Sequence, residues 1–316
     1  MEQGAITRFG RVRRKEFFRC YGKKEITRAR IRRRKKRNLL PYLLLLPVVV
    51  FITVFTIIPF IQNIYLSFYV TDSLGNPGSF VGLKNYIRIF TSEAFGNSLY
   101  ATLRFSVTVA VGTFLVSMIT ALLCATAKGG KVFQIMFALP MAVASAPLSA
   151  IANYMLSNYG VLNKVLGTEI GWLTDEKIAV FVVAGVTIWS SMGASFIFLM
   201  AGFKNVPADL VEEAKIDGAG ALRRVLYIYI PIASPQIFFV IFLNILSALK
   251  QFGIIKFLAG SGPNDSTNIL VYALYSNAMY RGRFETACVY AIVLSVIIFV
   301  VTRIQLLCEK RMVHYQ

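Results

Sequence analysis

Six long apolar stretches constrain this chain more than any other feature of its sequence. The first, from about Leu39 to Tyr69, would extend about 46 Å as an α-helix, whereas the hydrocarbon core of a bilayer is about 30 Å thick. It must therefore tilt, protrude or kink at Pro47 or Pro59. The other five run from about Leu99 to Ala127, Val132 to Leu156, Ile178 to Phe203, Gln236 to Ala259 and Thr286 to Leu307.

The apolar stretches predict transmembrane helices. A backbone in lipid must satisfy its own hydrogen bonds, and the stretches are continuous rather than alternating, which excludes a β-barrel. Only 16% of the residues are charged, whereas soluble domains carry about 25%. We therefore expect an all-α polytopic membrane protein with about six transmembrane helices over residues 39–308.

The net charge of +19 is concentrated at the N-terminus, where residues 1–38 hold sixteen Lys and Arg. A basic segment beside the first apolar stretch is typical of a cytoplasmic tail, and anionic membrane lipids would attract it. No nucleic-acid-binding fold or set of stacking aromatic residues accompanies these charges, so we expect no nucleic-acid partner. Six crossings return the chain to the cytoplasm, where residues 309–316 form a short C-terminal tail.

The sequence offers little for catalysis. The four cysteines have no metal-ligand spacing, the only histidine is His314, and no glycine-rich phosphate loop ending in Gly-Lys-Ser/Thr occurs. Acid–base and nucleophilic chemistry therefore lack their usual residues. We expect no metal and no cofactor on this chain, and no enzymatic activity of its own.

The longest cytoplasmic segment, residues 204–235, predicts a short helix–turn–helix that lies along the membrane surface. Asn205 can cap its first helix, and Pro207 suits a first helical turn. The helix should stop or bend at Gly218 and Gly220. A generic amphipathic interfacial helix would give a similar pattern.

Within this segment, "EEAKIDGAG" followed by "IYIPIASP" resembles the EAA loop of ABC importer permeases. The motif's Glu falls on Glu212, its second Ala on Ala214, its Asp-Gly pair on Asp217 and Gly218, and its proline on Pro231. Glu213 departs from the usual first Ala. The resemblance implies a type I ABC importer fold with a cytoplasmic coupling helix, in a multi-pass protein of the bacterial plasma membrane.

Other stretches resemble the sugar-permease branch of that family, which includes the maltose and glycerol-phosphate transporter subunits. They are "FVGLKNYIRIF" from Phe80, "GVLNKVLG" from Gly160 and "SGPNDSTNILVYALYSNAM" from Ser261. No Gly-Ala-Val-Lys-Gly-like ending occurs. In this respect the chain is similar to the first, maltose-F-type member of a permease pair. The resemblance covers about Leu40 to Cys308.

The resemblance implies a permease subunit that imports a sugar or sugar-like solute. Its partners would be a dimer of separate ATPase subunits, which bind ATP and Mg, a second permease subunit, and an external solute-binding protein. The coupling loop would contact the ATPase through Leu210, Glu212, Glu213, Ala214, Asp217 and Gly218. In that reading, Gly218 makes the tight turn, Leu210 and Ala214 give apolar docking, and the acidic residues give polar contacts or local caps.

Polar residues inside the apolar segments are candidates for the solute path, because such residues cost free energy unless they face a cavity or a partner helix. The candidates are Asn153, Tyr154, Trp189, Ser190, Ser191, Asn244, Lys250 and Gln251. An aromatic ring such as Trp189 can stack on a sugar face. Hydrogen bonding between helices, or snorkelling, is the alternative role for each of them.

Three other functions are alternatives to a sugar importer subunit. One is an ABC importer for a solute that is not a sugar. A secondary transporter would usually need an intramembrane carboxylate for ion coupling, and none of the six segments contains Asp or Glu in its core. A scaffold or insertase would not require a loop that docks an ATPase.

Overall fold

The computed structural model describes residues 40–126 and 131–312, and this part of the chain is predominantly helical. The basic N-terminal tail lies outside the described residues. The chain divides into two compact units, Met1–Phe60 and Ile61–Gln316, which are described separately. Among the described residues, four helices are long and apolar enough to cross a membrane, or six spans result if each of two bent helix pairs counts as one. The prediction of about six membrane helices is therefore confirmed.

The first apolar stretch forms one continuous helical segment made of α2 (Leu40–Ile52), a π-helical turn η1 (Thr53–Ile57) and α3 (Ile58–Leu66). A tilt, a protrusion or a kink at Pro47 or Pro59 was expected here, and the structure shows a π-helical turn that ends two residues before Pro59. Pro59 has no N–H to donate to the carbonyl of Phe55, and a wider turn just before a proline accommodates that missing bond. The same arrangement recurs before Pro231, where η3 (Val225–Tyr229) is also a π-helical turn.

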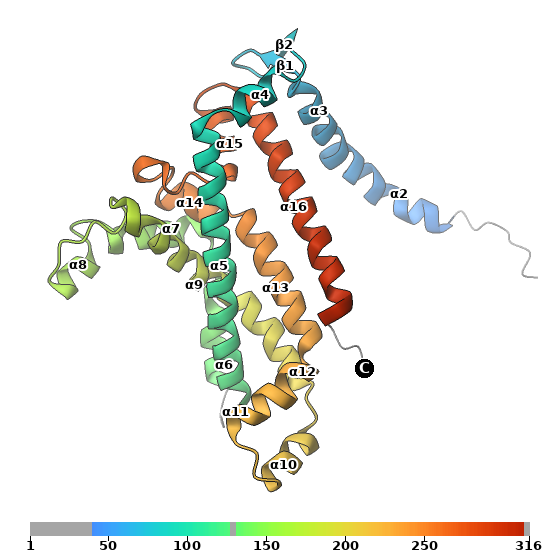
Figure 1. The fold of residues 1–316 in the computed structure, drawn as a ribbon, viewed down its shortest axis with the longest axis vertical. Helices are drawn as coiled ribbons and strands as arrows, with labels where there is room; N and C mark the ends of the chain where they lie inside the picture. Colours follow the sequence, from blue (N-terminus) through green and yellow to red (C-terminus); the bar gives the residue numbers. More distant parts are fainter. Residues whose placement is uncertain (1–39, 127–130, 313–316) are drawn as a thin grey trace, which may run out of the picture. The chain divides into compact units, whose positions relative to one another are not determined.

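The centre of the second unit is a bundle of α5 (Glu93–Thr126), α9 (Glu176–Lys204) and α13 (Ser234–Leu249), which pack against one another (Figure 1). Small side chains line the contacts and allow the backbones to approach closely. Ala121, Ala179 and Ala184, for example, are completely buried. At Gly112 of α5, a Cβ would press on the Ile188 side chain of α9.

The third and fifth apolar stretches are broken helices rather than straight spans. Residues 131–166 form α6 (Lys131–Ala138), the 3-10 turn η2 (Leu139–Ala142), α7 (Ser145–Leu156) and α8 (Val161–Leu166), with a bend of 98° after Ala142. In the fifth stretch, α13 ends at Leu249, and the chain resumes as α14 (Gly253–Leu258). Ile254, Ile255 and Leu258 bury α14 in the bundle core, so the expected single helix to Ala259 gives way to two pieces.

One end of the bundle, here called the hairpin end, carries an antiparallel hairpin of β1 (Tyr69–Thr71) and β2 (Pro77–Phe80), followed by α4 (Lys84–Phe90). In its turn, Asn76 donates hydrogen bonds to the Asp72 carboxylate from both its side chain and its backbone. These bonds hold the pKa of Asp72 below its ordinary value.

Two further helices complete the hairpin end. The 3-10 turn η4 (Pro263–Asp265) leads to α15 (Leu270–Met279), which packs on α16 (Phe284–Met312). Glu285 in the first turn of α16 is buried, accepts a hydrogen bond from Thr71 at 2.6 Å and pairs with Arg88 at 3.3 Å. The hairpin, α4 and α16 are thereby tied together.

Candidate functional site

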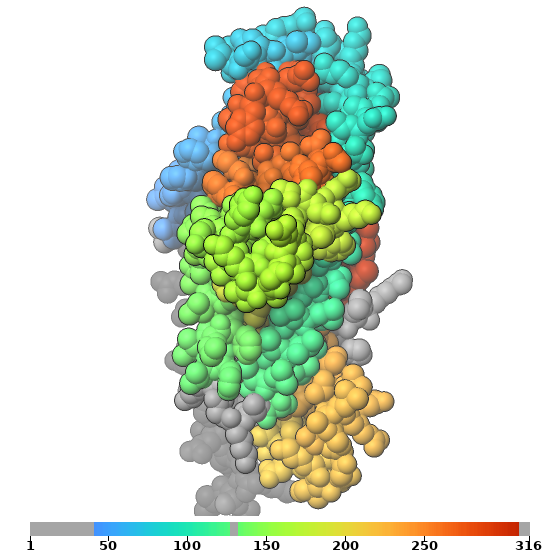
Figure 2. Space-filling view, turned by 90° about the vertical axis from the view of Figure 1, so that its left-hand side faces the viewer, coloured from blue at the N-terminus to red at the C-terminus, as the bar shows by residue number. Residues whose placement is uncertain are grey.

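The predicted helix–turn–helix is present at the end of the bundle opposite the hairpin. It comprises α10 (Ala208–Ile216), α11 (Ala221–Arg224), η3 and α12 (Ile230–Ile232), and it leads into α13 through a bend of 77° (Figure 1). Figure 2 shows α10 and α11, in gold, standing out beyond the bundle.

The expected cap of this first helix is wrong. Asn205 lies at the C-cap of α9, and its N–H bonds to the carbonyls of Gly202 and Phe203. Because α9 continues to Lys204, Asn205 is used to end that helix. Pro207 takes the N-cap position of α10 and makes no side-chain cap.

The turn after α10 is closed by backbone hydrogen bonds around Gly218. The N–H of Ala219 bonds to the carbonyl of Ala214 at 2.8 Å, and the N–H of Gly218 bonds to the carbonyl of Lys215 at 3.1 Å, which is the Schellman arrangement. Gly218 has φ +76°, and a Cβ there would meet nothing within 4 Å. The glycine is therefore required by backbone conformation and not by crowding. The Arg224 side chain also donates to the carbonyl of Ala219, which fixes the far side of the turn.

The two faces of α10 differ. Val211 packs against the core cluster that includes Phe203 and Tyr229, and Ala214 is half-buried. Leu210 is 44% exposed and Ile216 is 81% exposed.

The acidic residues of the predicted coupling loop face outward with Gly218. Glu212, Glu213 and Asp217 are exposed, and their carboxylates make no hydrogen bond within the described residues. Of the predicted contact residues, only Ala214 supports the helix from within. Ile216 is a strongly exposed apolar residue that the sequence interpretation did not assign.

A second candidate site is a small polar cavity between α5, α9 and α13. It is lined by Val109, Thr113, Thr187, Ser191, Asn244, Ser247, Ala248 and Gln251. Asn244 accepts a hydrogen bond from the Ser195 hydroxyl at 2.7 Å. The Asn244 amide nitrogen and the Thr113 hydroxyl are buried and have no partner among the described residues. Buried polar groups of this kind are normally satisfied, and this cavity, of about 10 Å³, has room for one water molecule that could bond to both.

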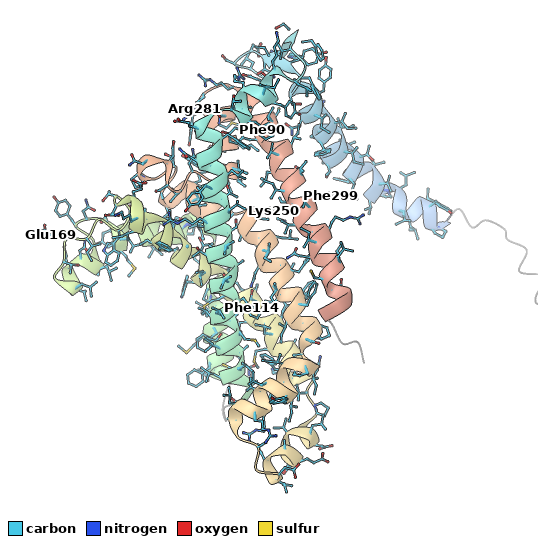
Figure 3. All side chains as sticks on the ribbon, in the orientation of Figure 1. Phe90, Phe114, Glu169, Lys250, Arg281 and Phe299 are labelled. Carbon is cyan, nitrogen blue, oxygen red and sulfur yellow. The ribbon has the colours of Figure 1, made fainter. Side chains whose placement is uncertain are left out.

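The structure brings Asn244, Gln251 and Ser191 together in this cavity and leaves the other predicted path residues out. Asn153 donates from α7 to the carbonyl of Leu258, Tyr154 is 71% exposed, and Trp189 is 43% exposed. Ser190 is half-buried outside the cavity lining. Lys250 is exposed at the end of α13 (Figure 3).

Three polar lining residues, Thr113, Thr187 and Ser247, were missed by the sequence interpretation, and helical spacing would have found the last two. Thr187 lies one turn before Ser191, and Ser247 lies between Asn244 and Gln251 at helical intervals. Trp189, two residues from Thr187, is about 200° around the helix and points elsewhere.

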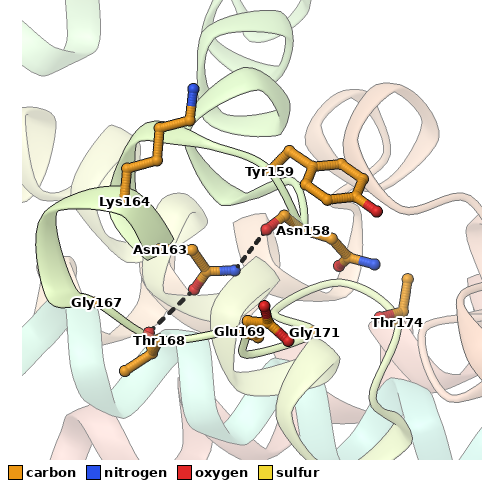
Figure 4. A pocket seen from close by; sticks show the side chains of 9 residues that line it. All are labelled: Asn158, Tyr159, Asn163, Lys164, Gly167, Thr168, Glu169, Gly171 and Thr174. Atoms are coloured by element: carbon orange, nitrogen blue, oxygen red, sulfur yellow. Dashed lines mark hydrogen bonds between the residues drawn. The ribbon is translucent and has the colours of Figure 1, made fainter.

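A pocket on the α8 loop is built around Asn163 (Figure 4). The buried Asn163 amide donates to the carbonyls of Asn158 at 3.0 Å and Ile170 at 2.8 Å, and its oxygen accepts from Thr168 and from the Trp172 indole. Because Asn163 is fully used in holding the loop, its role there is structural.

Comparisons with known proteins identify the family of this chain. Residues 117–314 match the family model described as binding-protein-dependent transport system inner membrane component. The sn-glycerol-3-phosphate transport system permease protein UgpA of Agrobacterium fabrum is 33% identical over 88% of this chain and 97% of its own length. The protein of the same name from Yersinia enterocolitica is 32% identical over 88% of this chain and 96% of its own.

Among solved structures, the fold matches a chain of a bacterial ABC transporter involved in the import of the acidic polysaccharide alginate. The TM-score is 0.79 at 21% identity, covering 90% of this chain and 100% of that chain. This likeness confirms the predicted permease fold. The chain therefore belongs to the family of binding-protein-dependent transport system inner membrane components, the permease subunits of ABC importers.

Proposed function

We propose that this chain forms half of a translocation path for a sugar or sugar-like solute and receives its power stroke at α10 from a separate ATPase dimer. The observation that carries the proposal is the closed turn at Gly218, which presents exposed Leu210, Ile216 and acidic side chains on a rigid support. A short helix fixed on both sides can transmit a rigid-body shift.

The connection from α10 to the cavity is direct. Val211 and Val225 pack α10 and η3 on the same core cluster, and the chain then bends into α13, which carries Asn244. A displacement of α10 would therefore move one wall of the cavity. Once such a displacement widens the cavity, which now has room for one water molecule, the Asn244 amide with the Thr113 and Ser191 hydroxyls would suit a solute rich in hydroxyl groups.

The relatives support a sugar-like solute. Two of them are named as sn-glycerol-3-phosphate permeases, and the solved relative belongs to an alginate importer. A related structure contains that importer in complex with an alginate pentasaccharide-bound periplasmic protein, which supports an external binding protein as a partner here. A non-sugar solute carried by the same kind of importer is the alternative.

In this proposal the α10 end and both termini face the cytoplasm, and the hairpin end faces outward. The sixteen basic residues of positions 1–38 favour this orientation. A second permease subunit would complete the path, and ATP with Mg would bind to the ATPase partner. Secondary transport is disfavoured because no Asp or Glu follows Glu93 in α5 or Glu176 in α9, and none occurs in α13.

The docking role is tested by Ile216→Lys in the complete importer. Ile216 is 81% exposed, so the substitution should leave the fold intact and place a charge in the ATPase interface. We expect loss of ATPase co-purification and of ATP-dependent uptake. Leu74→Lys is the matched control, since Leu74 is 84% exposed at the hairpin end. The docking role is wrong if Ile216→Lys still co-purifies with the ATPase and still supports ATP-dependent uptake. It is also wrong if Leu74→Lys loses the ATPase to the same extent.

A further inference from the structure

Lys256 is held among aromatic rings just after the α13 helix breaks. Its Nζ lies 4.3 Å from the centroid of the Tyr275 ring, 5.3 Å from that of Phe257 and 5.6 Å from that of Phe252. Tyr275 in turn packs edge-on against Tyr280, with centroids 5.4 Å apart. Such contacts attract an ammonium group to the ring faces. We call these five residues the Lys256 box.

The Lys256 box adjoins the polar cavity. Gln251 lines the cavity, and the next residue, Phe252, packs against Tyr275 with ring centroids 5.0 Å apart. The box therefore continues the cavity wall along α14 toward α15, on the hairpin side of α13 (Figure 1). Because the other face of α14 is buried in the core, the helix backbone under Lys256 is fixed.

No carboxylate of residues 40–126 or 131–312 forms a salt bridge with the Lys256 ammonium. The one salt bridge found among the described residues joins Arg88 to Glu285. Arg104 in α5 is similarly unbalanced and lies over the Phe181 ring at 4.9 Å, while Lys250 is exposed beside the cavity. The helices around the cavity thus carry fixed positive charge without acidic partners, and such a field favours the passage of anions.

Aromatic rings at a membrane surface also hold lysines that snorkel toward lipid headgroups. That role explains an ammonium over aromatic faces but not its placement beside a polar cavity. The observations favour a ligand that moves along the cavity wall.

We propose that the Lys256 box selects the anionic group of the solute, and that the solute is a hydroxylated molecule bearing a phosphate or a carboxylate. This inference rests on the proposed transport function and narrows its substrate class. The ammonium of Lys256 pairs with the oxyanion, and the faces of Tyr275 and Tyr280 pack against the C–H groups of the solute.

The test uses the complete importer, with its second permease, ATPase and binding protein, in proteoliposomes. The probes are sn-glycerol-3-phosphate and an alginate oligosaccharide as anions, and glycerol and maltose as neutral solutes. We expect ATP-dependent uptake of an anionic probe. Lys256→Gln should raise the KM for that probe about tenfold or more, because hydrogen bonds to charged groups are stronger than neutral ones. Lys256→Arg should stay close to wild type.

Lys177→Gln is the matched control, since it removes an exposed positive charge from the first turn of α9 and lies outside the Lys256 box. It should leave KM unchanged. The assay is repeated at two fractions of phosphatidylglycerol, so that a solute anion and a lipid headgroup give different results. A lipid site would make Lys256→Gln abolish the dependence on phosphatidylglycerol without changing KM.

That lipid result would overturn the proposal. An unchanged KM in Lys256→Gln, or uptake confined to neutral probes, would also overturn it. Loss of the second permease from the Lys256→Gln complex would do the same, because it would indicate a carboxylate partner on that subunit. The absence of ATP-dependent uptake of any probe by the wild-type complex would instead count against the proposed function itself.

Discussion

Gly218 gives the sharpest test of how α10 works, because its substitution changes backbone conformation without crowding. With φ +76° and no atom within 4 Å of a Cβ, a side chain there costs only the left-handed conformation. That cost is about 1–2 kcal/mol for an ordinary residue. The population of the closed turn should then fall about 5- to 30-fold. Asn tolerates this conformation better than β-branched residues do.

We therefore expect Gly218→Val to reduce ATP-dependent uptake and solute-stimulated ATP hydrolysis strongly, and Gly218→Asn to reduce them little. Both variants should insert normally. Gly167→Val is the matched control, because Gly167 also has a positive φ, +65°, and nothing within 4 Å, but ends α8 instead of α10. It should keep the ATPase bound. Equal activity of the Val and Asn variants at position 218, or wild-type coupling in Gly218→Val, would refute the reasoning.

Two further predictions concern the cavity and the hairpin end. Asn244→Leu removes the cavity amide and the hydrogen-bond partner of Ser195. We expect the KM for solute uptake to rise severalfold, in line with about 0.5–1.5 kcal/mol for a neutral hydrogen bond, while the ATPase stays bound. An unchanged KM would show that Asn244 does not line the path. Glu285→Gln weakens buried bonds to Thr71 and Arg88 and should destabilise the fold by about 1–3 kcal/mol in thermal unfolding. Arg88→Gln should cost less, since the Arg88 side chain is 58% exposed; a larger loss in Arg88→Gln would contradict this.

The long membrane helices were well predicted because hydropathy reports burial in lipid directly. The expected spans at 99–127, 178–203 and 286–307 correspond to α5, α9 and α16, each of which begins a few residues earlier than its apolar core. Their extra residues are polar end turns such as the one capped by Asp175, whose carboxylate accepts from the backbone of Lys177 and Ile178. Hydropathy does not detect such turns.

Breaks inside apolar stretches could not be predicted in the same way. The interruption after Leu249 contains Lys250, Gln251 and Gly253, but hydropathy averaged over the whole apolar stretch hides them. What stabilises the interruption is the burial of Ile254 and Ile255 against other helices. Likewise α15 was not predicted, because its position depends on Leu270 and Ala273 packing in a cluster with α16. Both features depend on tertiary contacts.

The candidate sites show the same division. The coupling loop was predicted from a local motif, and its turn at Gly218 forms through hydrogen bonds to residues a few positions away. The cavity joins residues from three helices, and only the polar ones that share a helical face with Asn244 and Ser191 reach it. Trp189 and Tyr154 lie outside this cavity and are exposed on the surface of this chain, so their place on a path shared with a second subunit stays a prediction.

The central claim is that a separate ATPase binds this chain at α10. It is tested most directly by placing a photo-crosslinking amino acid at position 216 or at position 74 of the assembled importer and identifying the crosslinked partner. The account predicts a crosslink to the ATPase from position 216 and none from position 74. A crosslink to the ATPase from position 74, or none from position 216 in an importer that hydrolyses ATP, would contradict it.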